Sequence, residues 1–219
     1  MRRSIVVAAT LLLVAIVARA EVKVTVAHND NDKATAEFKF KDVPSPAKEN
    51  AARNAKISIV QGTRDDMGGE LDKVNDGKLP TEEDQPEENF FFAQNTDGGR
   101  LLIDLGKVID VAQVNTYSWH PNTRGPQVYR LYASDGTDKS FSAKPAEGRD
   151  PTKVGWKLIA TVDTRPKQGQ GGGQYGVNIA DSTGSIGKYR YLLLDASRTE
   201  DDDPFGNTFY SEITVVEKK

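Results

Sequence analysis

Residues 128–134 read Val-Tyr-Arg-Leu-Tyr-Ala-Ser, and this stretch decides the fold class. Tyr129, Leu131 and Ala133 would share one face of an extended strand, because successive side chains of a strand point to opposite sides. Residues 156–162 repeat the alternation of apolar and other side chains. Strands with a single apolar face are typical of antiparallel sheets that cover a core.

The same alternation predicts short strands along the rest of the chain, separated by turn-rich segments. We expect them at 22–27, 34–41, 56–61, 100–105, 113–119, 128–134, 157–162, 175–179, 189–196 and 212–216. The first two would form a hairpin. Residues 45–55 are expected as the one short helix, because Ser45 can cap it and Pro46 fits its first turn.

Many half-apolar strands and almost no helix predict an all-β protein built as an antiparallel β-sandwich. The core is expected to contain the following apolar residues: Leu102, Tyr129, Leu131, Trp156, Leu158, Tyr191 and Ile213. We assign the sandwich to residues 61–219. Residues 21–60, the hairpin and the short helix, are expected to pack on it, because two strands alone are marginal in water.

Composition excludes several classes of protein. The 219 residues contain no cysteine, which rules out disulfide scaffolds, thiol enzymes and cysteine-based zinc or iron–sulfur sites. Arg2, Arg3 and Arg19 lie in the first 20 residues; without them, 26 basic side chains remain of the 29, against 32 acidic ones. The resulting net charge near −6 argues against a nucleic-acid partner.

Residues 1–20 have the pattern of a secretory signal peptide. A short basic start precedes thirteen apolar or small residues, 5–17, and Ala18-Arg19-Ala20 supplies the small-x-small cleavage pattern before Glu21. Thirteen residues fall short of the roughly 20 that span a bilayer. We therefore expect an exported protein, secreted or periplasmic, with no membrane span.

Six segments in order carry a family resemblance. They are Asn75–Thr81, Leu102–Gly106, Arg124–Gly136, Trp156–Ala160, Lys188–Leu194 and Ser211–Val215. Together they resemble the discoidin family, also called the coagulation factor 5/8 type C family, of the galactose-binding-domain-like superfamily. Leu193 stands where that family usually has a second arginine. The resemblance implies a jelly-roll sandwich with a short N-terminal extension.

The resemblance also implies a structural calcium ion. Its ligands would be Asp76, Thr81 and Glu212, with backbone carbonyls near Lys78. Calcium is a hard cation that takes about six to eight oxygen ligands, which suits these groups. The alternative is that Asp76 and Thr81 only form a turn through side-chain bonds to the backbone, while Glu212 pairs with an arginine.

The family's sugar sites lie on loops at one end of the sandwich, which here points to the connection after the 113–119 strand. His120, Asn122 and Arg124 could bind sugar hydroxyls, and Trp119 could supply a flat ring for the C–H face of a sugar. The last long loop would add Phe205, Asn207 and Phe209. The alternatives are a core role for Trp119, no role for His120, and a loop-bridging role for Arg124.

We expect no enzyme activity, because the sequence has two histidines far apart, no Gly-x-Ser-x-Gly motif and no motif that pairs carboxylates across a cleft. The predicted function is that of an exported, non-catalytic module that binds carbohydrate or a cell-surface glycan. The alternative is a protein–protein interaction or structural module of the cell envelope, which would use the same loops.

Overall fold

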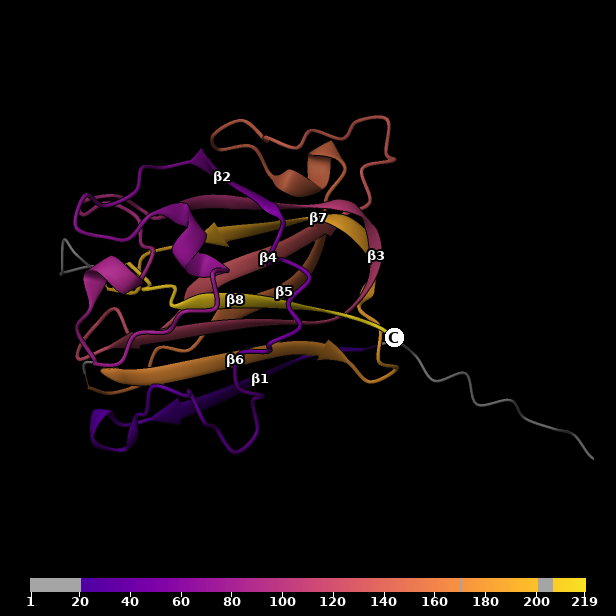
Figure 1. Ribbon diagram of the computed structural model, residues 1–219. Helices are drawn as coiled ribbons and strands as arrows, with labels where there is room; N and C mark the ends of the chain where they lie inside the picture. Colours follow the sequence, from indigo (N-terminus) through magenta and orange to yellow (C-terminus); the bar gives the residue numbers. More distant parts are fainter. Residues whose placement is uncertain (1–20, 170, 201–206) are drawn as a thin grey trace, which may run out of the picture.

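The computed structural model describes residues 21–169, 171–200 and 207–219 (Figure 1). Residues 1–20, the expected signal peptide, and Phe205 lie outside these ranges. The strands are β1 (Val22–Asn29), β2 (Lys56–Gln61), β3 (Gly99–His120), β4 (Val128–Ser134), β5 (Lys157–Asp163), β6 (Gly173–Asp181), β7 (Gly187–Ala196) and β8 (Glu212–Glu217). Four short 3-10 helices accompany them: η1 (Asn31–Lys33), η2 (Leu71–Val74), η3 (Pro86–Glu88) and η4 (Pro151–Val154).

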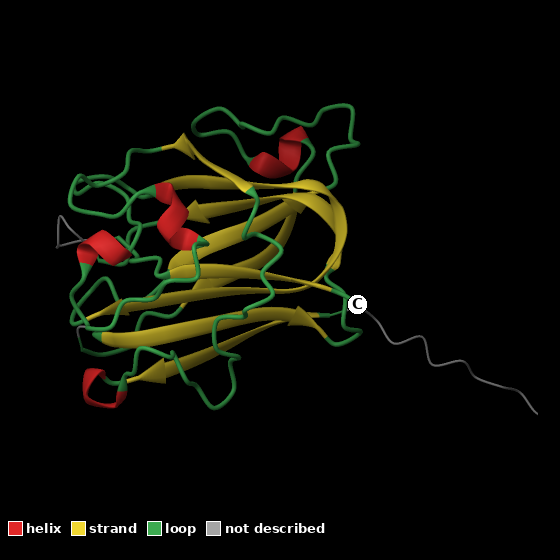
Figure 2. Cartoon of the chain, in the orientation of Figure 1, coloured by secondary structure: helices red, strands yellow, loops and turns green. Residues whose placement is uncertain are grey.

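The long strand β3 belongs to both layers of the molecule. Its first part pairs with β2 and β7, and its second part pairs with β6 and β8, always antiparallel. One layer therefore has the order β2-β3-β7-β4-β5, and the other β1-β6-β3-β8. Figure 2 shows the two layers stacked, with loops and short helices around them. The predicted all-β antiparallel sandwich is confirmed.

The bend in β3 connects the layers. The register between β3 and β7 shifts between Asp104 and Ile109. Gly106 lies within this stretch at φ +80°, a left-handed conformation that favours glycine, and its N–H donates to Oδ1 of Asp104 at 2.9 Å. The part of β3 before this bend and the part after it then face each other across the core.

Apolar side chains from both layers fill that core. They include Leu101, Ile103, Val114, Tyr129, Leu131, Val177, Ile179, Leu192, Leu194, Ile213 and Val215. Of the residues expected inside, Leu102, Tyr129, Leu131, Trp156 and Ile213 are buried and Tyr191 is half-buried. Leu158 corrects the prediction, since it is 43% exposed. The register between β4 and β5 skips Ile159, so the strict alternation that would have buried Leu158 is broken there.

The N-terminal segment also differs from the expected hairpin and helix. β1 pairs with β6, whereas residues 34–41 form no strand. Residues 45–55 form turns, because the Ala51 N–H donates to the Val215 carbonyl and the Asn50 side chain bonds to the β8 backbone. These long-range bonds to β8 replace the local bonds of a helix. Within the described residues, no helix combines the length and apolarity needed to cross a membrane.

Candidate functional site

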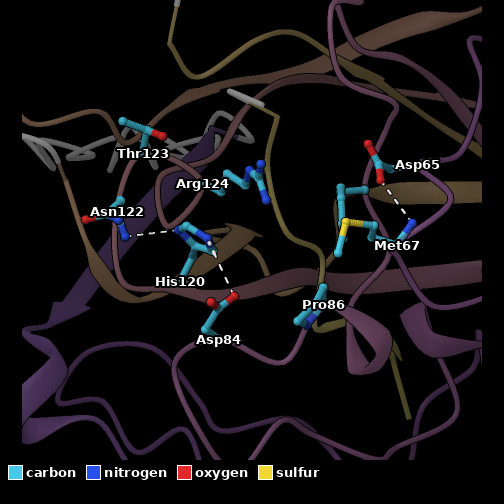
Figure 3. Close-up of a pocket in the computed structure, with 9 residues that line it drawn as sticks. Asp65, Met67, Asp84, Pro86, His120, Asn122, Thr123 and Arg124 are labelled. Carbon is cyan, nitrogen blue, oxygen red and sulfur yellow. Dashed lines mark hydrogen bonds and ion pairs between the residues drawn. The ribbon is translucent and has the colours of Figure 1, made fainter. Parts of the chain in front are cut away.

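A pocket of about 320 Å³ opens beside the end of β3 (Figure 3). The loop that follows β3 supplies one wall, and the connection between β2 and β3 supplies the other. The lining residues are Asp65, Met67, Asp84, Pro86, Phe91, His120, Asn122, Thr123 and Arg124. Antiparallel pairing places the start of β8 beside the end of β3, so the segment before β8 lies under the same pocket.

Hydrogen bonds within the sandwich hold the loop after β3. Ser118 Oγ donates to the Gly125 carbonyl at 2.6 Å, and the Gln127 side-chain amide donates to Ser118 Oγ at 3.0 Å. The glycine-rich segment before β6 closes against this loop: a Cβ on Gly172 would lie 1.8 Å from the Pro121 carbonyl oxygen. Only glycine allows that approach. Hydrogen bonds from the sandwich and the close packing of the segment before β6 therefore both hold the loop.

His120 is the last residue of β3 and lines the pocket. Its Nδ1 accepts the Asn122 backbone N–H at 3.0 Å, so the neutral ring carries its hydrogen on Nε2. Nε2 lies 4.0 Å from Oδ1 of Asp84, whose side chain is 65% exposed. The ring also packs edge-on against Phe209, with 4.7 Å between ring centres. His120 therefore presents an N–H donor beside an exposed carboxylate.

Arg124 is held over two stacked aromatic rings. Phe91 and Phe209 stack with 4.1 Å between ring centres, and the Arg124 guanidinium carbon lies 5.5 and 5.0 Å from them. The Arg124 carbonyl also accepts the Phe209 N–H at 3.2 Å. Such a stack attracts the cation and fixes the plane of the guanidinium at the pocket wall.

Asp65 shapes the opposite wall. Its Oδ1 accepts the Met67 N–H and its Oδ2 accepts the Gln94 N–H, both at 3.0 Å. Sequence reasoning missed Asp65, Met67, Asp84, Pro86 and Phe91. The turn-forming run Asp-Asp-Met-Gly-Gly at 65–69 signals a turn. No local pattern shows, however, that this turn faces residues 120–124.

The structure brings together three of the predicted binding residues, His120, Asn122 and Arg124, and separates Trp119 from them. Trp119 is buried with Phe38, and its Nε1 donates to Asn31 Oδ1 at 3.2 Å. The reason is the alternation of a strand, which points neighbouring side chains to opposite faces. Trp119 therefore cannot be the aromatic platform of this pocket.

The predicted residues of the last loop have different positions. Phe209 is fully buried beneath the pocket, where it supports His120 and Arg124. Asn207 is buried and donates from Nδ2 to the Ala93 carbonyl at 3.1 Å. Neither lines the pocket.

Two of the three predicted calcium ligands, Asp76 and Glu212, belong to a second polar cluster, which we call the β8 corner: Asn50, Arg53, Asp76, Gly77 and Glu212. Glu212 is buried, its Oε1 accepts from the Asn50 amide and its Oε2 accepts from the Gly77 N–H, both at 3.0 Å. Burial raises the pKa of Glu212 to about 7, against the opposing effects of the Gly77 N–H, the Arg53 guanidinium and the Asn50 amide.

The residues of the β8 corner do not fit a calcium ion. Arg53 donates to the Asp76 carbonyl, so a guanidinium cation stands among the oxygens that would coordinate the metal. Oδ1 of Asp76 accepts the Lys78 N–H at 2.8 Å, and the Thr81 hydroxyl bonds to Gln85. Calcium requires about six to eight free oxygen ligands. Across the described ranges, no group of three or more His, Cys, Asp or Glu side chains could hold a metal.

The fold and the pocket together define an all-β sandwich with a loop-lined pocket at one end. The sequence matches no protein-family model and no curated protein. Among solved structures, the chain is similar to the lectin domain of lectinolysin in complex with Lewis b antigen. The TM-score is 0.49 and the identity 16%, covering 78% of this chain and 99% of that one.

Two further structures show similarity of the same degree. One is a fucose-binding module of Streptococcus pneumoniae, with a TM-score of 0.49 and 12% identity, covering 78% of this chain and 99% of the module. The other is a chitosan-binding module from a chitosanase/glucanase of Paenibacillus sp., in complex with chitotriose. There the TM-score is 0.46 and the identity 16%, covering 76% and 98% of the two chains. At these values, function has to be argued from the pocket itself.

Proposed function

We propose that this protein is an exported, non-catalytic module that binds a carbohydrate in the pocket between His120, Arg124 and Asp65. The observation that carries the proposal is the composition of the pocket wall. Donors and acceptors stand around a volume of about 320 Å³, beside apolar surface from Met67 and Pro86. A pocket of this size suits a small ligand such as one sugar unit.

The chemistry of the wall suits sugar hydroxyls. A hydroxyl both donates and accepts, so its ideal partners are N–H groups beside carboxylates. The His120 ring and the Arg124 guanidinium carry N–H groups at this wall, the exposed Asp84 carboxylate can accept, and the exposed Asn122 amide can do both. Met67 can meet the C–H face of the ring, the role that an aromatic platform would otherwise fill.

The roles of the carboxylates support a non-catalytic module. Glycoside hydrolysis uses two carboxyl groups, one of them a proton donor, on either side of the bond to be cut. Both oxygens of Asp65 already accept backbone N–H bonds and shape a turn. Asp84, the other carboxylate that lines the pocket, stands on the exposed side beside His120.

Export and family membership belong to the same proposal. Export is supported by the sequence of residues 1–20, and membership of the discoidin-like modules by the six ordered motifs between 75 and 216. The partner would then be a carbohydrate or a cell-surface glycan outside the cytoplasm.

Calorimetric titration of residues 21–219 with galactose, fucose and chito-oligosaccharides tests the proposal. We expect dissociation constants of about millimolar, because a shallow sugar site exchanges water contacts for protein contacts with little gain. Arg124→Ala should abolish measurable binding. Asn122→Ala should weaken binding roughly three- to tenfold, the contribution of one hydrogen bond.

Asn54→Ala is the matched control, since Asn54 is also an exposed asparagine but does not line the pocket. We expect its affinity to equal that of the unmodified protein. If the unmodified protein binds none of these sugars, or if Asn54→Ala weakens binding as much as Asn122→Ala does, the proposed site is wrong.

A further inference from the structure

We propose that Met67 is an oxidation site that regulates the pocket: a peroxide converts its thioether to the sulfoxide, and carbohydrate binding weakens. The inference rests on the proposed function, because it concerns the same pocket. It starts from the sulfur content of the chain. The sequence has no cysteine and two methionines, Met1 and Met67. If residues 1–20 are removed on export, Met67 carries the only sulfur atom of the protein.

Met67 is held at the pocket in an exposed position. Its N–H donates to Asp65 Oδ1, and the Gly68 N–H donates to the Asp65 carbonyl, both at 3.0 Å, so a tight turn fixes its backbone. Its side chain is nevertheless 69% exposed, the largest value among the exposed large hydrophobic residues of the described ranges. In Figure 3, Met67 lies on the other side of Arg124 from His120 and Asn122.

Met67 can contact a ligand in the pocket, because it lines the pocket wall and is exposed. Phe91, which also lines the pocket, is only 2% exposed, and Pro86 is half-buried. Among the apolar lining residues, Met67 therefore offers the largest exposed fraction to a ligand. A flexible thioether can adapt to the C–H face of a sugar ring, because it is apolar and polarizable.

The oxidation is a two-electron oxygen transfer from hydrogen peroxide. A lone pair of the Met67 sulfur attacks one peroxide oxygen, and the O–O bond breaks. That oxygen stays on sulfur as the sulfoxide and gives up its proton, while the other oxygen takes up a proton and leaves as water. The product is polar and chiral, so the apolar face of the pocket is lost. An exported protein meets such oxidants outside the reducing cytoplasm.

The test compares residues 21–219 before and after treatment with hydrogen peroxide. Mass spectrometry should show the gain of a single oxygen atom, on the peptide that contains Met67. The sugar affinity should fall roughly three- to tenfold, because a contact the size of one or two methylene groups is lost. A saturating concentration of the sugar should slow the oxidation severalfold, because the ligand covers the sulfur.

Two variants separate the pocket from general oxidation damage. In Met67→Leu, peroxide should leave the affinity at its untreated value, whatever that value is. The double variant Met67→Leu, Leu158→Met carries its only sulfur on β5, at a position that is 43% exposed and does not line the pocket. It should gain one oxygen without any change in affinity.

Other outcomes would contradict the inference about Met67 or the proposed function. If the fully oxidised protein binds sugar as tightly as the untreated one, or if the sugar gives no protection, the inference is wrong while the proposed function stands. If peroxide weakens the double variant equally, the effect is not local to Met67 and the inference is wrong. If the untreated protein binds no sugar, the proposed function fails and the inference with it.

Discussion

The pocket beside the end of β3 and the β8 corner are both polar clusters, and they differ in where their hydrogen bonds go. In the β8 corner, the Asn50 side chain makes four bonds: its amide donates to the Glu212 carboxylate and the Ile213 carbonyl, and its oxygen accepts from the N–H groups of Ala52 and Val215. In the pocket, His120 Nε2 lies 4.0 Å from Oδ1 of Asp84, and both residues line the cavity.

This difference separates a structural cluster from a candidate binding site. Polar groups that satisfy one another inside the protein stabilise a connection between segments, here between residues 50–77 and β8. Polar groups that border a cavity can exchange water for a ligand. Residue type alone does not distinguish the two cases, because both clusters contain an arginine, an asparagine and carboxylates.

The largest effect is expected from Asn50→Ala. It would remove the Asn50 partner of Glu212 Oε1, of the Ile213 carbonyl and of the Val215 N–H, and leave Glu212 only the bond from the Gly77 N–H to its other oxygen. Unsatisfied buried groups, one of them charged, should cost roughly 3–5 kcal/mol of the free energy of unfolding. Urea denaturation measures this loss. Asn122→Ala, the same change at the pocket, should stay within about 0.5 kcal/mol; similar losses at both positions would contradict the comparison.

A smaller effect is expected from pH. The unfolded chain loses the Glu212 proton near pH 4.5, and the folded protein holds it up to about pH 7. Between these values the folded state binds more protons, so this group lowers the free energy of unfolding as the pH rises, by up to about 3 kcal/mol. The titratable and charged groups beside Glu212 include Arg53, Asp76 and Tyr117.

Urea denaturation between pH 4.5 and 8 checks this prediction against Glu212→Gln, in which the decline should disappear. Carboxyls with a lowered pKa, such as Asp104 beside Arg190, titrate below this window and do not obscure it. A free energy of unfolding that rises over the same range, or a decline that persists in Glu212→Gln, would show that burial does not raise the pKa of Glu212 in the folded protein.

The smallest effect is expected from calcium. Because the Arg53 guanidinium stands at the Asp76 carbonyl, millimolar calcium or a chelator should change the melting temperature by less than about 1 °C. Differential scanning calorimetry measures it. A calcium-dependent rise of several degrees in the melting temperature would mean that the ion displaces Arg53 from the Asp76 carbonyl and that the β8 corner is a metal site.

Most of the strands and most of their inward faces could be predicted from the sequence, although the strand predicted at 34–41 does not form. The reason is that the alternation of side chains is a local property, readable wherever a strand runs without interruption. It failed at Leu158, where a bulge between β4 and β5 breaks the period. It could also have separated Trp119 from His120, because neighbouring residues of a strand point to opposite faces.

Which polar residues line the pocket and which bond to one another in the β8 corner depends on the tertiary structure. Residues 45–55 have a local helix signal, yet bonds from Asn50 and Ala51 to β8 hold them as turns. Met67 and Asp65 reach the pocket from a turn more than 50 positions away from His120. Such approaches depend on strand pairing across the whole chain, which sets distances that no local pattern contains.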